Sequence, residues 1–347
     1  MGWPSGAVPF IANPLAAMQT QAQPTLNTPL QSPARQVAPG VYVKRLLFVN
    51  VIFLGEPGGP WILIDAGMPG YADAILAAAH TIYGPDARPE ACVLTHGHYD
   101  HIGSLADVLA RVWPGLPVYA HPLELPYLDG RAAYPPPDPT VGGGVMPWVA
   151  LGFPRGPFDF SANLRRLPAD GTVPYAPGWH YIHTPGHAPG HVSLWREPDR
   201  CLVAGDAVVC TRQESAYWVA TQRPELNGPP KYWTTDWQAA ARSVRTLAEL
   251  KPTTLVSGHG APLQGLRLFQ AFGRLTSRFE AEQVPHGGRY ATTPALQTDE
   301  GVVYVPHAPL RPYLKLGLWV AGGLAALWWL GKAKGSKRPK KQKASPA

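Results

Sequence analysis

Cysteine is scarce in this chain, with three among 347 residues. Cys92, Cys201 and Cys210 are widely spaced and form no CxxC pair. An odd number at such spacing argues against a disulfide framework and against a thiolate zinc site, and it fits a reducing cytoplasm. The segment before Arg35 also lacks Lys, Arg and a continuous apolar run, so it does not have the pattern of a secretory signal.

Charged residues are few as well, at 15% of the chain, and the net charge of +7 is unevenly distributed. Seven of the 30 Lys and Arg residues lie after Leu330, which leaves 23 basic residues against 23 acidic ones in the rest. The part of the chain before the tail is formally neutral, so it has no excess of Lys and Arg side chains to bind a phosphate backbone. We therefore expect no nucleic-acid partner.

The chain divides by composition into five predicted parts. Residues 1–36 are rich in Pro, Ala, Gln and Thr, have no helical or strand period, and are predicted to be a disordered lead. Residues 37–285 contain the apolar periodic segments and are predicted to form one folded domain. Residues 286–312 are predicted to be a Pro-rich linker, 313–331 a transmembrane helix and 332–347 a basic tail.

The membrane prediction depends on residues 316–330, which carry no charge. They are short for a hydrocarbon core of about 30 Å, but flanking lysines can extend towards water and the three Trp residues suit the interface. The basic tail fits contact with anionic lipid. We expect the protein to be held at a membrane by this C-terminal anchor, with its domain 37–285 in the cytoplasm.

Short β-branched or aromatic runs alternate with helical patterns along the predicted domain. The predicted strands lie at 41–54, 61–64, 91–95, 118–120, 178–184, 191–196, 200–204 and 254–257. The predicted helices lie at 70–83, 102–112 and 236–250. Residues 122–177 are dense in Pro, Gly and aromatics, and we interpret them as an irregular but ordered cover over a site.

The strongest signal is the run His96-Gly-His98-Tyr-Asp100-His101, directly after a predicted buried strand. Imidazole and carboxylate ligands together suit zinc, iron or manganese. His96 and His98 can face one ion while Asp100 and His101 face another, and a pair of metal ions is a known hydrolytic arrangement.

Three further candidate ligands follow at strand ends: His187 after a Pro-Gly turn, Asp206 after Ala-Gly, and His259 between glycines. Glycine permits the sharp bends and close approach that aim ligands at one point. A single His after a turn is usually an ordinary surface residue, but seven candidates at strand ends argue for a metal centre. His121, His180 and His183 have no such position and are treated as ordinary.

In this order the motifs resemble those of the metallo-β-lactamase superfamily, over about Val41 to Leu266. The resemblance implies an α/β fold, a four-layer αββα sandwich, and two Zn²⁺ per chain, with iron or manganese as alternatives. It implies that Asp206 bridges the ions and that Asp65 orients a ligand imidazole. The implied ligands of site one are His96, His98 and His187, and those of site two are Asp100, His101 and His259.

Two neighbouring residues permit alternative interpretations. His191 is either a further ligand or a hydrogen-bonding support, and we favour the support because one His of the pair suffices. Tyr99 is equally well a wall of the pocket or simply exposed.

The predicted function is hydrolysis of a small molecule by a hydroxide that two ions hold, with Asp100 acting on a proton. Ester, lactone, thioester, amide and phosphodiester bonds stay open, because no motif chooses among them. The alternative is an oxidoreductase similar to sulfur dioxygenases, which use a similar set of His ligands around one iron. Metal content separates the two.

Overall fold

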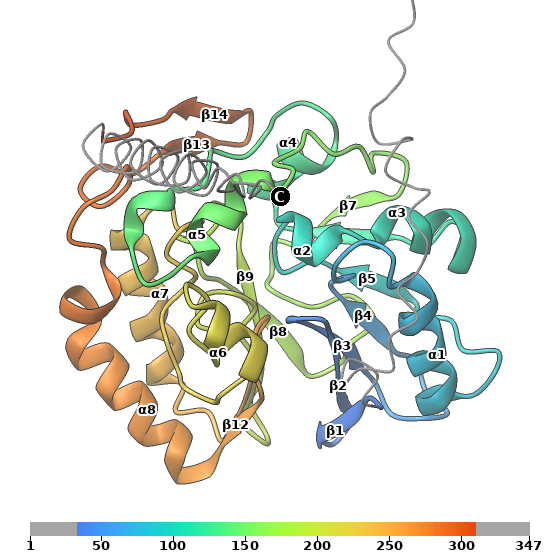
Figure 1. Ribbon diagram of the computed structural model, residues 1–347. Coiled ribbons are helices and arrows are strands. Elements are labelled where there is room, and N and C mark those ends of the chain that lie inside the picture. Colours follow the sequence, from blue (N-terminus) through green and yellow to red (C-terminus); the bar gives the residue numbers. More distant parts are fainter. Residues whose placement is uncertain (1–32, 310–347) are drawn as a thin grey trace, which may run out of the picture.

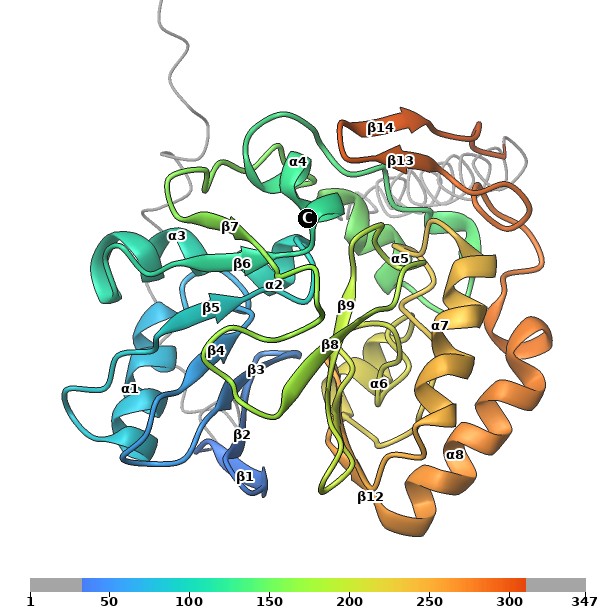
Figure 2. The same ribbon diagram turned by 180° about the vertical axis from the view of Figure 1, so that it is seen from behind.

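The computed structural model describes residues 33–309. Two β-sheets pack face to face, and helices cover the outer face of each (Figures 1 and 2). This is the predicted αββα sandwich. Residues 1–32 and 310–347, which include the predicted transmembrane helix 313–331 and the basic tail 332–347, lie outside the described residues.

The first sheet contains the N-terminal strands in the order β1 to β7. They are β1 (Arg35–Ala38), β2 (Val41–Leu46), β3 (Val49–Leu54), β4 (Ile62–Ile64), β5 (Ala91–Val93), β6 (Val118–Ala120) and β7 (Leu164–Arg166). Neighbours are antiparallel as far as β4, and β4 to β7 are parallel to one another. The carboxyl ends of β4 and β5 therefore point to the same edge.

The second sheet has the order β12-β11-β10-β9-β8. Its strands are β8 (Trp179–His183), β9 (Val192–Arg196), β10 (Cys201–Val203), β11 (Thr254–Val256) and β12 (Leu263–Gln264). Only β10 and β11 are parallel, so these two strands also end at one edge. Each sheet thus contains a pair of neighbouring parallel strands whose carboxyl ends lie at one edge of that sheet.

The covering helices pack on the sheets through their apolar faces. Those beside the first sheet are α1 (Ala72–Tyr83), α2 (Tyr99–Ile102) and α3 (Leu105–Asp107), and those beside the second are α7 (Trp237–Glu249) and α8 (Gly265–Arg278) (Figure 1). Three short helices occur in loops: α4 (Leu125–Leu128), α5 (Met146–Val149) and α6 (Ala216–Thr221). Single 3-10 or π turns lie at Val108–Val112, Pro122–Glu124, Pro139–Val141, Ala150–Gly152 and Phe279–Gln283.

The layer between the sheets is aliphatic. Ile62 and Val93 from the first sheet share one buried cluster with Val192 and Val203 from the second. Burying apolar surface of this kind contributes about 25 cal/mol per Å². On the outer side, Asp236 caps α7 by accepting a hydrogen bond from the amide of Ala239 at 2.9 Å, as a capping carboxylate does. The core therefore joins the two sheets into one body.

Within the predicted domain, three sequence predictions differ from the structure. The run 41–54 is two strands, because Leu47 turns the chain with φ of 61°. The predicted helix 102–112 is broken after Ile102, where the side chain of Ser104 bonds to the carbonyl of Met68 and the amide of Tyr71. The stretch 122–177 is not wholly irregular, since it contains β7, which pairs with β6.

The segment expected to be a linker carries a hairpin, β13 (Leu296–Thr298) and β14 (Gly301–Tyr304). Side-chain hydrogen bonds attach it to the domain, which a composition-based prediction cannot detect. At the other end, Arg35 and Gln36 of the predicted lead already pair with β2. Across residues 33–309, no helix has the length and apolar character needed to cross a membrane.

Candidate metal centre

All seven predicted ligands lie beyond the carboxyl ends of strands. His96, His98, Asp100 and His101 follow β5, and Asp206 and His259 follow β10 and β11. His187 lies in the turn that joins β8 to β9. Ligands commonly bind at such strand ends, where neighbouring loops converge.

The structure brings these seven side chains together from both sheets. In the first ligand group, defined as His96, His98 and His187, the potential ligand atoms lie within 4.8 Å of one another. The same holds for the second ligand group, defined as Asp100, His101 and His259. Asp206 forms a further group with His96 and His101.

Asp206 lies between the two ligand groups. Its Oδ2 is 3.6 Å from Nε2 of His187 in the first group and 3.1 Å from Nε2 of His259 in the second. Its Oδ1 is 3.6 Å from Nε2 of His101. Within the first group, Nδ1 of His98 lies 2.9 Å from Nε2 of His187. A carboxylate in this position can contact two ions at once.

Hydrogen bonds to the outer ring nitrogens turn the imidazoles towards the centre. Asp65, buried at the end of β4, contacts Nδ1 of His101 at 2.8 Å, which confirms the predicted contact with a ligand imidazole. The carbonyl of Phe48 lies 2.9 Å from Nδ1 of His259. Such contacts orient a metal-binding His and raise its basicity.

Asn50 fixes the turn that carries His259. From β3 of the first sheet its side-chain amide donates to the carbonyls of Ser257 and Gly260, at 2.9 and 2.8 Å, and its backbone amide donates to Gly258 at 2.7 Å. This buried residue therefore links the two sheets beside the centre.

His191 makes the hydrogen bonds expected of a support. Its Nδ1 lies 2.9 Å from the hydroxyl of Thr184, and its Nε2 accepts a hydrogen bond from the amide of Asp206 at 2.8 Å. Both ring nitrogens are therefore occupied. Tyr99 is partly buried and stacks on Phe158 with ring centroids 6.1 Å apart, so it packs against the cover segment.

The first ligand group consists of imidazoles that burial keeps neutral. Burial lowers the pKa of His98 to about 4 and lowers the pKa of His96 and His187 well below its usual value. A neutral imidazole has the lone pair that a metal ion needs. Near pH 7 this group is ready to donate to a cation.

In the second ligand group, attraction between oppositely charged side chains determines the direction of the pKa shifts. Burial acts to lower the pKa of His259, but the carboxylates of Asp206 and Asp100 raise it to about 9. Burial would raise the pKa of Asp206, yet His259 and His101 hold it well below the usual value. A cation between these groups would take the place of the ring protons.

Several buried polar atoms at the centre have no hydrogen-bond partner among residues 33–309. They are Nε2 of His96, Nε2 of His101, Nδ1 of His187 and Oδ1 of Asp206. Buried polar atoms are nearly always paired, so four orphans in one place indicate a missing partner. Nitrogen and carboxylate ligands of this kind suit zinc or iron, and the residues fit two divalent ions.

Sequence reasoning singled out none of three further residues beside the candidate ligands. The Trp233 ring packs 4.8 Å from the His98 ring, and the Tyr134 ring lies 4.7 Å from it on an edge. Glu124 is fully buried and bonds to the amide of Gly97. The only local signal for Glu124 was its position between two leucines, which indicates burial but does not identify its hydrogen-bond partners.

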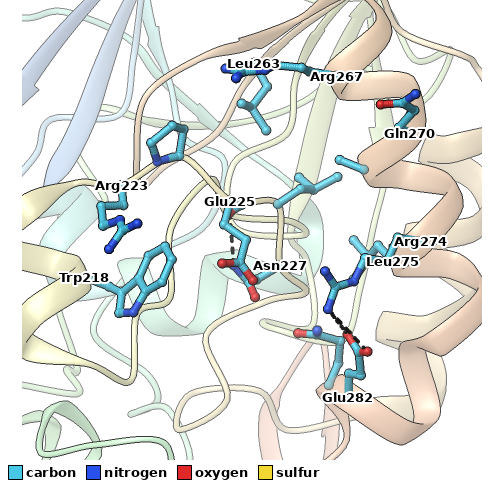
Figure 3. Close-up of a pocket in the computed structure, with 14 residues that line it drawn as sticks. Trp218, Arg223, Glu225, Asn227, Leu263, Arg267, Gln270, Arg274, Leu275 and Glu282 are labelled. Atoms are coloured by element: carbon cyan, nitrogen blue, oxygen red, sulfur yellow. Dashed lines mark hydrogen bonds and ion pairs between the residues drawn. The ribbon is translucent and has the colours of Figure 1, made fainter.

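A cavity of about 560 Å³ lies between α6 and α8, apart from the metal centre (Figure 3). Trp218, Arg223, Arg267 and Arg274 are among its lining residues, and none of the seven candidate ligands is. This cavity is therefore not the candidate catalytic site, because the side chains that could hold a metal ion and activate water lie elsewhere.

Comparisons with known proteins show what this chain is similar to. A family model described as "Metallo-beta-lactamase superfamily" matches residues 45–259. The probable metallo-hydrolase YflN of Bacillus subtilis is 41% identical over 248 residues, which are 71% of this chain and 93% of that protein. The probable metallo-hydrolase YybB of the same organism is 30% identical, over 59% of this chain and 78% of that protein. A solved B3 metallo-β-lactamase with an active-site glutamic acid is 18% identical, with a TM-score of 0.49, over 73% of this chain and 90% of that one.

Proposed function

This chain belongs to the metallo-β-lactamase superfamily, and from that membership and its site we propose that it is a hydrolase with two zinc ions. The proposed substrate is a small molecule with an ester, lactone, thioester or related bond. Membership supports metal-dependent hydrolysis in general. The number of ions, their identity and the bond that is cleaved are our proposal.

One observation carries the proposal: seven candidate ligand side chains from both sheets converge, and several of their buried atoms have no hydrogen-bond partner within the described range. A fold does not retain unpaired buried polar atoms for stability, because each costs about 1–3 kcal/mol. Their arrangement is explained if cations bind there.

Two bound divalent ions would supply hydroxide near neutral pH, because a metal ion lowers the pKa of its water to about 7. Asp206 would contact both ions from its position between the ligand groups. Asp100 has a side chain that is 16% exposed, whereas the other six ligands are buried. It is therefore the ligand that can exchange a proton with an approaching substrate.

The rings beside the ligands favour an uncharged substrate with apolar parts. Trp233 packs against His98, and Phe48 stacks near His259 with ring centroids 6.0 Å apart. Aromatic walls of this kind bind acyl or ring portions by burying their surface. Carboxylic esters, lactones and thioesters meet this requirement better than phosphodiesters do.

The test is metal analysis of the purified protein, followed by a panel of lactone, ester, thioester, β-lactam and phosphodiester substrates. We expect two zinc ions per chain. We also expect Asp206→Ala to abolish turnover and lower metal content, because it removes the carboxylate that both groups share. His180→Ala, which changes an exposed histidine outside the centre, serves as the control and should behave as wild type.

Two results would contradict the proposal. Full activity in Asp206→Ala would remove the bridging role of that residue. A single iron per chain, with oxidation of a persulfide and no hydrolysis, would favour the oxidoreductase alternative.

A further inference from the structure

Glu124 is a buried acid that the proposed chemistry does not use. It ends the turn Pro122–Glu124 and has no exposed surface. Its Oε2 accepts hydrogen bonds from the amide of Gly97, at 2.9 Å, and from the hydroxyl of Tyr134. Its Oε1 accepts a hydrogen bond from the amide of Gly190 at 2.7 Å. Three donors from three different segments thus meet at one carboxylate.

The two amides belong to the turns that carry the first ligand group. Gly97 lies between His96 and His98, and Gly190 follows His187 by three residues. These turns are far apart in the sequence and come from different sheets. The carboxylate of Glu124 is therefore a direct link between the two segments that supply the three imidazoles.

Both glycines are needed for this close approach. A Cβ on Gly190 would lie 2.8 Å from Cγ of Glu124, and a Cβ on Gly97 would lie 2.5 Å from the hydroxyl of Tyr134. Real Cβ atoms do not approach other atoms so closely. The backbone at both turns is shaped to fit the Glu124 and Tyr134 side chains.

Tyr134 extends the link to a ligand ring. Its hydroxyl contacts both Glu124 and, at 3.0 Å, the amide of Gly97. Its ring meets the imidazole of His98 edge-on, with centroids 4.7 Å apart. The orientation of that imidazole therefore depends on a side chain that Glu124 holds.

Fold stability alone does not account for Glu124. Burial raises its pKa to about 7, although the Tyr134 hydroxyl and the two amides lower it. The hydrogen bonds thus offset only part of the cost of burying the charge. A buried charge that is only partly compensated is explained if its role is to hold other groups in place.

We propose that Glu124 is a positioning residue whose carboxylate keeps the turns at Gly97 and Gly190 at the separation that metal binding by the first ligand group requires. The inference depends on the proposed metal function of that group. Glu124 contacts neither the substrate nor an ion. It acts through the backbone of the ligand turns and through the ring of Tyr134.

The test compares Glu124→Gln with wild type in a chelator competition for zinc and in the absorption spectrum of the cobalt-loaded protein. Gln has nearly the same shape but one acceptor oxygen fewer, so one amide loses its partner. We expect metal affinity to fall by about 10- to 100-fold, as for other groups that support ligands. The cobalt bands should shift as well, because the geometry of the first group changes.

Asp138→Asn is the matched control. Asp138 is also a buried acid that accepts hydrogen bonds from backbone amides, those of Thr140 and Arg289, but neither amide belongs to a ligand turn. We expect it to lower the unfolding temperature without changing metal affinity. An equal loss of affinity in both variants would overturn the inference, because the effect would then be general destabilisation.

Two further outcomes separate this inference from the proposed function. If wild type binds two ions and Glu124→Gln binds them with the same affinity and spectrum, positioning is overturned while the function stands. If wild type binds no metal, both fail. Should Glu124→Gln not fold, Tyr134→Phe replaces it, since it keeps the ring beside His98 and removes the hydroxyl. An unchanged affinity in that variant would overturn the part of the inference that acts through Tyr134.

Discussion

Gly258 illustrates how little space the ligand residues leave to their neighbours. A Cβ at this position would lie 2.7 Å from Cε1 of His101 and closer still to Oδ1 of Asp206. Its carbonyl also accepts the backbone hydrogen bond from Asn50. The residue before His259 must therefore lack a side chain, because Asp206 and His101 occupy the space.

We predict that Gly258→Ala lowers metal occupancy and activity by at least an order of magnitude, because the added methyl group displaces Asp206 or His101. Metal analysis and turnover measure this. Gly273→Ala on α8 is the control, since a Cβ there meets nothing within 4 Å. It should keep full activity and gain about 0.5–1 kcal/mol of stability, the usual effect of Ala in a helix. Normal metal content in Gly258→Ala would contradict the assigned geometry.

The hairpin β13–β14 lies beyond the region matched by the family model, as do β12 and α8. Gln297 on β13 accepts a hydrogen bond from the hydroxyl of Tyr127 at 2.9 Å and donates one to the hydroxyl of Thr235 at 3.1 Å. Tyr127 in turn stacks on Tyr134 with centroids 4.0 Å apart. The hairpin thus contacts the segment 122–177 through the Tyr127 side chain.

We predict that Gln297→Ala lowers the free energy of unfolding by about 1–3 kcal/mol, because the Tyr127 hydroxyl loses its partner. Denaturant unfolding measures the change. Leu296→Ala on the same strand should change stability by less than about 0.5 kcal/mol, since Leu296 is 54% exposed. If both substitutions cost the same, the side-chain bonds of Gln297 are not what attaches the hairpin.

In the molecule as a whole, the centre lies where the two sheets meet. The first sheet supplies the run from His96 to His101, and the second supplies Asp206 and His259. An ion held by these residues would join both halves and would not be bound in this way by the unfolded chain. Metal binding should therefore stabilise the entire domain.

We predict that removing metal with a chelator lowers the unfolding temperature by several degrees, on the order of 5 °C for about 2.7 kcal/mol of binding stabilisation. Restoring zinc should reverse the change. The unfolding temperature of His101→Ala should fall less when metal is removed, because this variant lacks a candidate ligand of the second group. An unfolding temperature that is independent of metal would count against ligands shared by both sheets.

Local patterns were sufficient to predict the ligand candidates, and the resemblance that their motifs carry implied the αββα fold and the contact of Asp65 with the imidazole of a candidate ligand. Four of the seven ligand residues lie within six positions of each other, and the others follow strands in Gly-containing turns, so the signal is present in short segments. The preference for His191 as a support also agrees with its two hydrogen bonds. Short-range periodicity and turn chemistry decide such features.

Other features were decided only by tertiary structure. The run 41–54 contains no Gly or Pro to mark a turn. Its turn at Leu47 and the contact of Phe48 with His259 therefore depend on packing between the sheets. The link from Glu124 to Gly190 and the docking of Gln297 join segments that are distant along the chain. Pairing at such separations depends on how the whole chain packs, and no local pattern contains that information.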